Sequence, residues 1–170
     1  VEPSHFDAAT CYVSATRYKT DDNKPYLFKT NDYGKTWKLI VSGLPQNIYT
    51  RCVREDMHRD GLLYAGTETG IYFSLDDGAH WHSLQCNLPI SPITDIQIHG
   101  TENDLVIATF GRGFYVLDDY SPLRSTNPEM LEKDANIFAI KDALMYIQKD
   151  PLTGDSQGWQ GDNYYLAKNP

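Results

Sequence analysis

The 170-residue sequence has no long apolar run and no surplus of basic residues. Every apolar run falls short of the roughly 18 residues that suggest a membrane-spanning helix, so no membrane span is expected. The chain carries 15 Lys and Arg against 23 Asp and Glu, which gives a net charge of −8. A protein that holds a phosphate backbone needs a basic face, so this balance argues against nucleic acid as a partner.

Cysteine and the usual catalytic motifs are also scarce. Cys11, Cys52 and Cys86 are an odd number at irregular spacing, which indicates neither a disulfide framework nor a zinc site. Cys11 and Cys52 fall in expected strands, where we interpret them as small core residues, and their redox state is left open. No G-x-S-x-G is present and no His pairs with a Ser or Cys in the context of a nucleophile, so the sequence predicts no triad, metal or cofactor.

What the chain does have is an eight-residue phrase that occurs twice. Residues 30–37 read T-N-D-Y-G-K-T-W and residues 74–81 read S-L-D-D-G-A-H-W. The Asp and Trp of the second copy each follow those of the first by 44 residues (76 − 32 and 81 − 37). A fixed period in the forties is typical of the four-stranded blades of a propeller. The sequence therefore predicts an all-β chain of β-propeller blades, each with four antiparallel strands.

Extended apolar stretches flank each phrase, so we interpret it as the turn of a hairpin. Asp32 and Asp76 accept hydrogen bonds from their own turn, and Gly takes the positive φ that such a turn needs. The Trp residues then begin the outgoing strands and bury their rings between blades. The alternative, that these Asp residues bind metal or act as acids, is weaker because no His or Glu recurs at ligand spacing. The structural residues of the two boxes are Thr30, Asp32, Gly34, Trp37, Ser74, Asp76, Gly78 and Trp81.

A third, degenerate copy follows without a box. L-Y-A-G-T-E-T-G-I-Y (63–72) matches V-I-A-T-F-G-R-G-F-Y (106–115), which aligns Ala65 with Ala108 and Gly70 with Gly113. We expect blades over residues 1–122 and a closing or linking segment over 123–170 that leads toward a following domain. That segment should hold a short helix near 130–134, with Thr126 or Asn127 as its cap and Pro128 in its first turn, and extended stretches at 136–140 and 143–147.

The expected strands fall into three groups, and the first group lacks an obvious first strand. About three blades are too few to close a propeller, which typically needs four to eight. We therefore favour a fragment of a larger propeller, whose remaining blades are partners, over assembly from several copies. The expected strands lie near residues 11–16, 26–30, 37–41, 51–55, 62–66, 71–74, 81–84, 93–99, 105–109 and 114–117.

The runs D-D-N-K-P-Y-L-F-K-T-N-D-Y-G-K-T-W (21–37), L-Y-A-G-T-E-T-G-I-Y-F-S-L-D-D-G (63–78) and A-T-F-G-R-G-F-Y-V-L-D-D-Y-S-P-L-R (108–124) resemble the Asp-box, or bacterial neuraminidase repeat, propellers. They are most similar to bacterial secreted proteins described as glycosyl-hydrolase-like or sortilin-like. The resemblance covers residues 1–125. It implies a large, extracellular or periplasmic propeller that handles carbohydrate or peptide. It supplies no catalytic residue that maps onto this chain.

In a propeller the loops that enter the inner strands share one face with the turns between the second and third strands, and this is commonly the ligand face. Arg112, between two glycines, is either a solvated turn residue or a contact for an anion or a sugar hydroxyl. Glu68 either pairs with Arg112 across blades or is a glycosidase carboxylate, and Asp95 is either a hydrogen-bond acceptor at a strand start or part of the site. The ligand-face candidates are Asp21, Asp22, Tyr49, Arg51, Glu68, Asp95 and Arg112.

Three functions remain from the sequence. The favoured one is a non-catalytic scaffold that presents loops to a polysaccharide or protein partner, because fold alone does not give an activity. The alternative is part of a xyloglucanase- or sialidase-like glycoside hydrolase with catalytic carboxylates partly outside this chain. A purely structural segment is the third. Whether the chain is an enzyme is therefore left open, and no catalytic residue is assigned.

Overall fold

The computed structural model describes residues 1–131, 133–140 and 142. The chain divides into two compact units, Val1–Phe138 and Ala139–Pro170. All regular secondary structure of the described residues lies in the first unit, and the few described residues of the second form no helix or strand. The predicted extended stretch at 143–147 lies outside the described residues.

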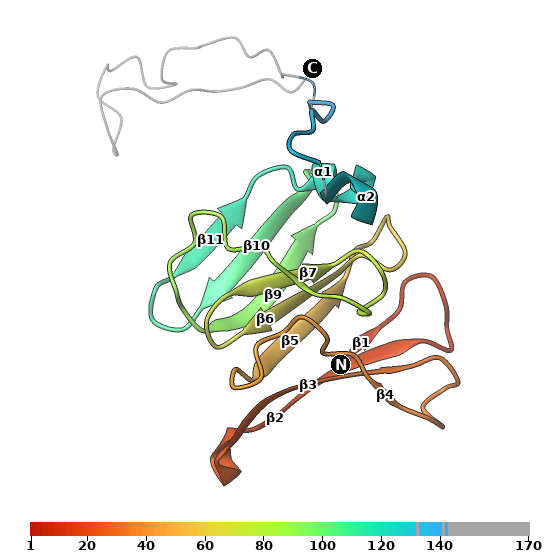
Figure 1. Cartoon of the computed structure of the whole chain (residues 1–170), viewed down its shortest axis with the longest axis vertical. Helices are drawn as coiled ribbons and strands as arrows, with labels where there is room; N and C mark the ends of the chain where they lie inside the picture. The colour runs from red at the N-terminus through yellow and green to blue at the C-terminus, as the bar shows by residue number, and fades with distance from the viewer. Residues whose placement is uncertain (132, 141, 143–170) are drawn as a thin grey trace, which may run out of the picture. The chain divides into compact units, whose positions relative to one another are not determined.

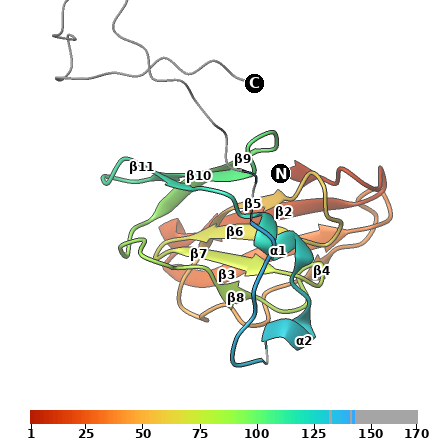
Figure 2. The same cartoon turned by 90° about the horizontal axis from the view of Figure 1, so that it is seen from above.

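The described chain is all-β apart from short helices, and its strands form three antiparallel sheets (Figures 1 and 2). We call these sheets the first, second and third blade, with strand orders β1-β2-β3-β4, β5-β6-β7-β8 and β9-β10-β11. The strands are β1 Glu2–Pro3, β2 Cys11–Arg17, β3 Asp22–Thr30, β4 Lys38–Leu39, β5 Thr50–Glu55, β6 Leu63–Thr67, β7 Ile71–Ser74, β8 His82–Ser83, β9 Ile93–His99, β10 Asp104–Thr109 and β11 Phe114–Leu117. The helices are the 3₁₀ turn η1 Tyr18–Thr20, α1 Ser121–Ser125 and α2 Pro128–Leu131.

The predicted strands are confirmed, but the start of the first blade, the fourth strands and the helices differ from the prediction. The first blade does have a first strand, because the two residues of β1 pair with Tyr12 and Cys11 on β2. The fourth strands β4 and β8 are only two residues long, shorter than predicted. Helix α1 was not predicted, α2 begins and ends earlier than the expected helix, and residues 136–140 form no strand.

The register of the third blade corrects the sequence alignment by one residue. Val53 on β5 and Ile96 on β9 hold equivalent places, since each is buried in the core between its own blade and the preceding one. Val53 pairs with Ala65, whereas Ile96 pairs with Ile107 rather than with Ala108. Ile107 therefore takes the place of Ala65, and Ala108 turns to the opposite face of its sheet.

The one-residue shift is absorbed in the hairpin turn that follows. In the second blade Thr67 Oγ1 donates to the Gly70 carbonyl at 2.8 Å, and in the third Thr109 Oγ1 donates to the Gly113 carbonyl at 2.7 Å. The turn in the third blade therefore holds one residue more between its hydrogen-bonded Thr and Gly than the turn in the second blade does. Gly113 has a φ of +75°, which suits glycine in this longer turn.

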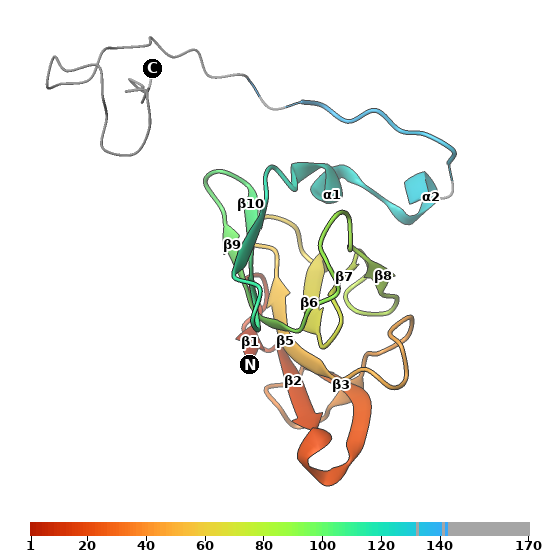
Figure 3. The same ribbon diagram turned by 90° about the vertical axis from the view of Figure 1, so that its left-hand side faces the viewer.

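The core lies between the blades, because each sheet buries apolar side chains against its neighbours. Strand β5 packs between β2 and β9, so the second blade is covered on both faces (Figure 3). Between the first and second blades lie Tyr12, Leu27, Ile40, Leu44, Val53, Leu63, Ala65 and Trp81. Between the second and third blades lie Cys52, Leu62, Tyr64, Ile71, Phe73, Leu75, Ile93, Ile96, Leu105, Ile107 and, from the residue before α1, Tyr120.

The two box tryptophans differ in burial, which corrects the prediction that both are buried. Trp81 is 3% exposed, lies in the core between the first two blades, and donates its indole N–H to the Ile40 carbonyl at 2.9 Å. Trp37 is 46% exposed and donates to the carbonyl of Gly34 in its own turn at 3.2 Å. The physical reason is the neighbour: the described chain places a blade before the second blade but none before the first.

This difference predicts unequal effects of the same substitution. Trp81→Phe leaves the buried Ile40 carbonyl without its donor and opens a void, so we expect it to lower the free energy of unfolding by about 2 kcal/mol. Trp37→Phe should lower it by less than about 0.5 kcal/mol. Urea unfolding of both variants measures the difference, and equal losses would contradict the buried position of Trp81.

Candidate functional site

The first box is a turn held by its own side chains. Asp32 Oδ1 accepts from the backbone N–H of Thr36 at 2.9 Å and from Thr30 Oγ1 at 2.9 Å, while its Oδ2 accepts from Thr36 Oγ1 at 2.7 Å. Gly34 has a φ of +81° and donates its N–H to Thr30 Oγ1 at 3.0 Å. These bonds, those from Thr36 above all, hold the pKa of Asp32 below its ordinary value.

The second box repeats this pattern. Asp76 Oδ1 accepts from the N–H of His80 at 2.8 Å and from Ser74 Oγ at 2.8 Å, and Gly78 (φ +82°) donates to Ser74 Oγ at 2.9 Å. His80 Nδ1 lies 2.7 Å from Asp76 Oδ2, in the place of the Thr36 hydroxyl. Against the opposing effect of burial, the bonds from His80 and Ser74 lower the pKa of Asp76. Both carboxylates are thus occupied by their own turns, and among the described residues no cluster of His, Cys, Asp and Glu suits a metal ion.

Three of the predicted ligand-face residues, Tyr49, Arg51 and Glu68, come together. Arg51 Nε donates to Glu68 Oε2 at 2.7 Å and its Nη2 donates to the Tyr49 hydroxyl at 3.1 Å. Tyr18, which the sequence did not single out, stacks on Tyr49 with ring centroids 5.0 Å apart and planes 17° from parallel. We call these four residues the tyrosine platform.

The platform is built from three loops of two blades. Tyr18 lies in η1 between β2 and β3, Tyr49 directly before β5, and Glu68 in the turn after β6. The guanidinium of Arg51 lies 5.3 Å from the centre of the Tyr49 ring, so aromatic and charged groups form one continuous stack. Tyr18 ends this stack and is 45% exposed, and Arg51 and Glu68 are each about one third exposed.

Arg51 and Glu68 each shift the pKa of the other toward the charged form. The bond to Glu68 raises the pKa of Arg51 above its ordinary value. Burial raises the pKa of Glu68, but the bonds from Arg51 and Tyr49 outweigh it and leave that pKa below the ordinary 4.5. Glu68 is therefore an ionised acceptor at neutral pH, and it pairs within its own blade rather than with Arg112 as the sequence suggested.

The remaining predicted residues lie apart from the platform contacts. Asp21 ends η1 with a φ of +59°. Asp22 accepts from the Tyr26 hydroxyl at 2.7 Å, a bond that lowers the pKa of Asp22. Asp95 forms an ion pair with Arg54. Arg112 is exposed in the longer turn between β10 and β11.

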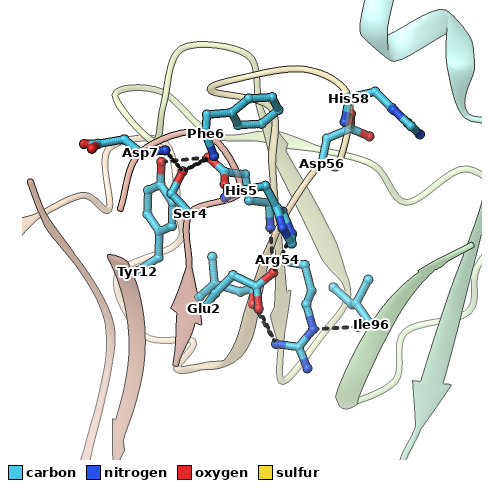
Figure 4. Close-up of polar contacts among 12 residues, drawn as sticks. Glu2, Ser4, His5, Phe6, Asp7, Tyr12, Arg54, Asp56, His58 and Ile96 are labelled. Carbon is cyan, nitrogen blue, oxygen red and sulfur yellow. Dashed lines mark hydrogen bonds and ion pairs between the residues drawn. The ribbon is translucent and has the colours of Figure 1, made fainter. Parts of the chain in front are cut away.

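Arg54 links the innermost strands of all three blades. Its guanidinium donates from Nε to the Ile96 carbonyl at 2.9 Å and lies 3.6 Å from the Glu2 carboxylate on β1 (Figure 4). It also pairs with Asp95 on β9. A polar cavity of about 320 Å³ opens beside it. Its lining residues are Val1, Glu2, His5, Arg54, Glu55, Met57, Gln97 and Ile98.

Beside Arg54, the fully buried Glu55 holds the loop after β1. Its carboxylate accepts from the His5 N–H at 2.6 Å, from Ser4 Oγ at 3.1 Å and from the Tyr12 hydroxyl at 3.3 Å. The same Tyr12 hydroxyl lies 2.6 Å from Asp77 and shares its single proton between the two carboxylates, so this network joins the first and second blades. Sequence reasoning missed it because the partners of Glu55 lie 43 to 51 residues away.

Asp56, the next residue, anchors α1. It is fully buried and accepts from the N–H of Arg59 at 2.7 Å and from Nε of Arg124 at 3.1 Å. Arg59 in turn donates to the carbonyls of Leu123 and Thr126 at the end of α1. A buried carboxylate with two arginines therefore fixes the helix that the sequence analysis missed.

Comparison with known proteins gives little beyond the fold. No protein-family model matches the chain, and no curated protein matches it significantly. A solved structure titled "YCF48 bound to D1 peptide" is similar to it, with a TM-score of 0.40 and 20% sequence identity over 55% of this chain. The match spans 30% of that chain, so the similarity concerns part of the larger protein. None of the helices in the described chain is long and apolar enough to cross a membrane.

The platform predicts a pH-dependent effect. In Arg51→Met the bond from Arg51 is lost and only the bond from Tyr49 still opposes the effect of burial, so the pKa of Glu68 should rise from its wild-type value. Because that pKa is lowered in the folded wild type, the pairing stabilises the fold at neutral pH and its contribution, at most about 1 kcal/mol, is lost as the pH falls through the folded pKa. NMR titration of the Glu68 carboxyl measures the shift. Arg17→Met, at the end of β2 directly before Tyr18, is the control, and an unchanged Glu68 pKa in Arg51→Met would contradict the pairing.

The Glu55 network predicts a stability effect. Tyr12→Phe removes a hydroxyl whose single proton is shared between the carboxylates of Asp77 at 2.6 Å and Glu55 at 3.3 Å, so the free energy of unfolding should fall by about 1–3 kcal/mol. Tyr33→Phe is the matched control, since the Tyr33 side chain is 76% exposed. Urea unfolding distinguishes the two, and a Tyr12 variant as stable as the Tyr33 variant would show that the network contributes nothing.

Proposed function

We propose that this chain is a non-catalytic segment of a β-propeller protein and that the tyrosine platform binds a polysaccharide or protein partner. The platform is the observation that carries this proposal. Stacked aromatic rings beside an ion pair offer an apolar face and hydrogen-bonding groups together, as binding sites for sugars and peptides require. The side chains are already held in place by one another, so a ligand would not have to order them.

Two finer parts of the proposal come from the sequence. The two turns are proposed to be Asp-boxes, which is supported by their matching hydrogen bonds and positive-φ glycines. The resemblance to secreted propellers supports a location outside the cytoplasm. Further blades, the platform's ligand and the absence of nucleic-acid binding belong to the same proposal.

The glycosidase alternative is less well supported by the ionisation of the carboxyl groups. A glycosidase needs one carboxylic acid whose pKa is raised so that it can protonate the leaving group. Five carboxyl groups of the described residues have a lowered pKa, so these five are ionised acceptors rather than general acids. They are Asp7, Asp22, Asp32, Glu68 and Asp76.

Binding assays test the proposal. The probes are xyloglucan, a sialylated oligosaccharide and an array of extended peptides. We expect at least one probe to bind, and Tyr18→Ala to weaken it about tenfold by removing the exposed ring of the stack, a loss of about 1.4 kcal/mol. Tyr33→Ala is the control because Tyr33 is an exposed tyrosine of the first box turn.

Two outcomes would overturn it. Equal binding by the wild type and Tyr18→Ala would place the ligand elsewhere. Release of sugars from either carbohydrate probe by the wild-type chain would show a glycoside hydrolase instead of a binding segment.

A further inference from the structure

Trp81 of the second blade contacts the first blade through two hydrogen bonds. Its indole N–H donates to the Ile40 carbonyl, which directly follows the outermost strand of the preceding blade, and its backbone N–H donates to the Ser42 carbonyl at 2.9 Å. Ile40 is held by its own N–H, which donates to Leu27 at 2.9 Å. The box tryptophan of the second blade thus hydrogen-bonds to backbone carbonyls just after the fourth strand of the first blade.

Trp37 holds the same place in the first blade and lacks this partner among the described residues. It is 46% exposed, and Leu39 two residues later is 48% exposed. Leu39 pairs with Phe28, and Phe28 pairs with Val13. We call Val13, Phe28, Trp37 and Leu39 the Trp37 face.

The second blade shows what such a face contacts. Phe28 and Val13 pair across two strands just as Tyr72 and Ala65 do. Tyr72 and Ala65 belong to the core that lies against the first blade. The Trp37 face therefore continues the interface already seen between the blades, shifted by one blade toward the start of the chain.

The third blade exposes the face that corresponds to the side of the second blade that the third blade covers. Phe114 and Val116 are 77% and 56% exposed, while Ile71 and Phe73, which hold the equivalent places on β7, are buried under the third blade. In the described chain this blade has three strands and no fourth. Its described residues therefore offer no carbonyl after a fourth strand for a box tryptophan to bind.

We propose that the Trp37 face binds a four-stranded antiparallel blade, and that Trp37 donates its indole N–H to the carbonyl after the outermost strand of that blade. As far as the described residues go, the third blade of a second copy does not meet this requirement. The inference rests on the proposed propeller role, but it does not depend on what the tyrosine platform binds.

The repeat itself indicates how to supply such a blade. Glu2 pairs with Tyr12 as Arg54 pairs with Tyr64, so β1 corresponds to the end of β5. Gln97 holds the same place on β9, which puts Val1 where Ile96 lies. Residues 1–95 fused directly before the full chain should thus make one continuous inner strand at the junction and set a complete second blade before the Trp37 face.

The burial of Trp37 in this fusion is the test. The leading segment carries Trp37→Phe, so that a single Trp37 remains, and all tryptophans are labelled with 5-fluorotryptophan. Solvent exposure is read from the ¹⁹F shift between H₂O and D₂O. We expect the Trp37 signal to show this shift in the full chain alone and to lose it in the fusion, as the buried Trp81 does.

A control variant in the leading segment removes the hydrogen bond that supports the proposed acceptor. Leu84 holds the place of Ile40 in the second blade, and its N–H donates to the Ile71 carbonyl at 3.0 Å. Leu84→Pro in the leading segment deletes that bond and should leave Trp37 exposed. The Trp81 signal of the leading segment shows in each case whether its blades are folded.

Two results would overturn the inference. One is a Trp37 that stays exposed in the fusion while both Trp81 signals are buried. The other is a full chain whose Trp37 becomes buried as its concentration rises, which would make a second copy the occupant. Ligand binding at the tyrosine platform is scored separately with Tyr18→Ala, so a failure of the proposed function would not be mistaken for either result.

Discussion

The burial of apolar side chains between successive blades is the interaction on which the rest of the structure depends. Each sheet is small, and among the described residues its fourth strand has two residues or is absent, so no sheet encloses a core by itself. The second blade is covered on both faces and therefore contains most of the fully buried side chains, including Leu62, Leu63 and Tyr64. The first and third blades each leave an apolar face open, at Trp37 and at Phe114.

Polar side chains then fix how the blades meet. Arg54 joins the three inner strands, and Glu55 ties the loop after β1 to the second blade. Buried charges are costly unless they are paired and hydrogen-bonded, and here each has several partners. These contacts make the relative position of the blades specific, and that position brings Tyr18 of one blade onto Tyr49 of the next. The proposed binding site is thus a consequence of how the blades pack.

The sequence was sufficient for the elements whose signals are local. The box turns depend on bonds between residues two and four apart, and the strands on alternation within a repeated unit. It could not tell Trp37 from Trp81, because the two boxes are alike and only the neighbouring blade differs. It also missed the partners of Glu55 and the stacking of Tyr18, which join residues far apart in the chain.

The one-residue shift in the third blade has a similar cause. Both alignments of β10 preserve a plausible strand, and only the face that packs on the second blade decides between Ile107 and Ala108. Three of the predicted ligand-face residues come together, namely Tyr49, Arg51 and Glu68. They lie at the start of β5 and just after the end of β6, which adjoin because the two strands are antiparallel. A pairing of Arg112 with Glu68 was one alternative from the sequence, but Glu68 pairs with Arg51 and Arg112 is exposed in the longer turn of the third blade.

Native-state hydrogen exchange of the 170-residue chain tests most directly whether the three blades are one body held by its central sheet. If they are, the amides of β5 and β6 exchange most slowly, and those of β4 and β11 at the open edges exchange fastest. Protection that is greatest in the first or third blade, or three sheets that each exchange in a separate step, would contradict the account.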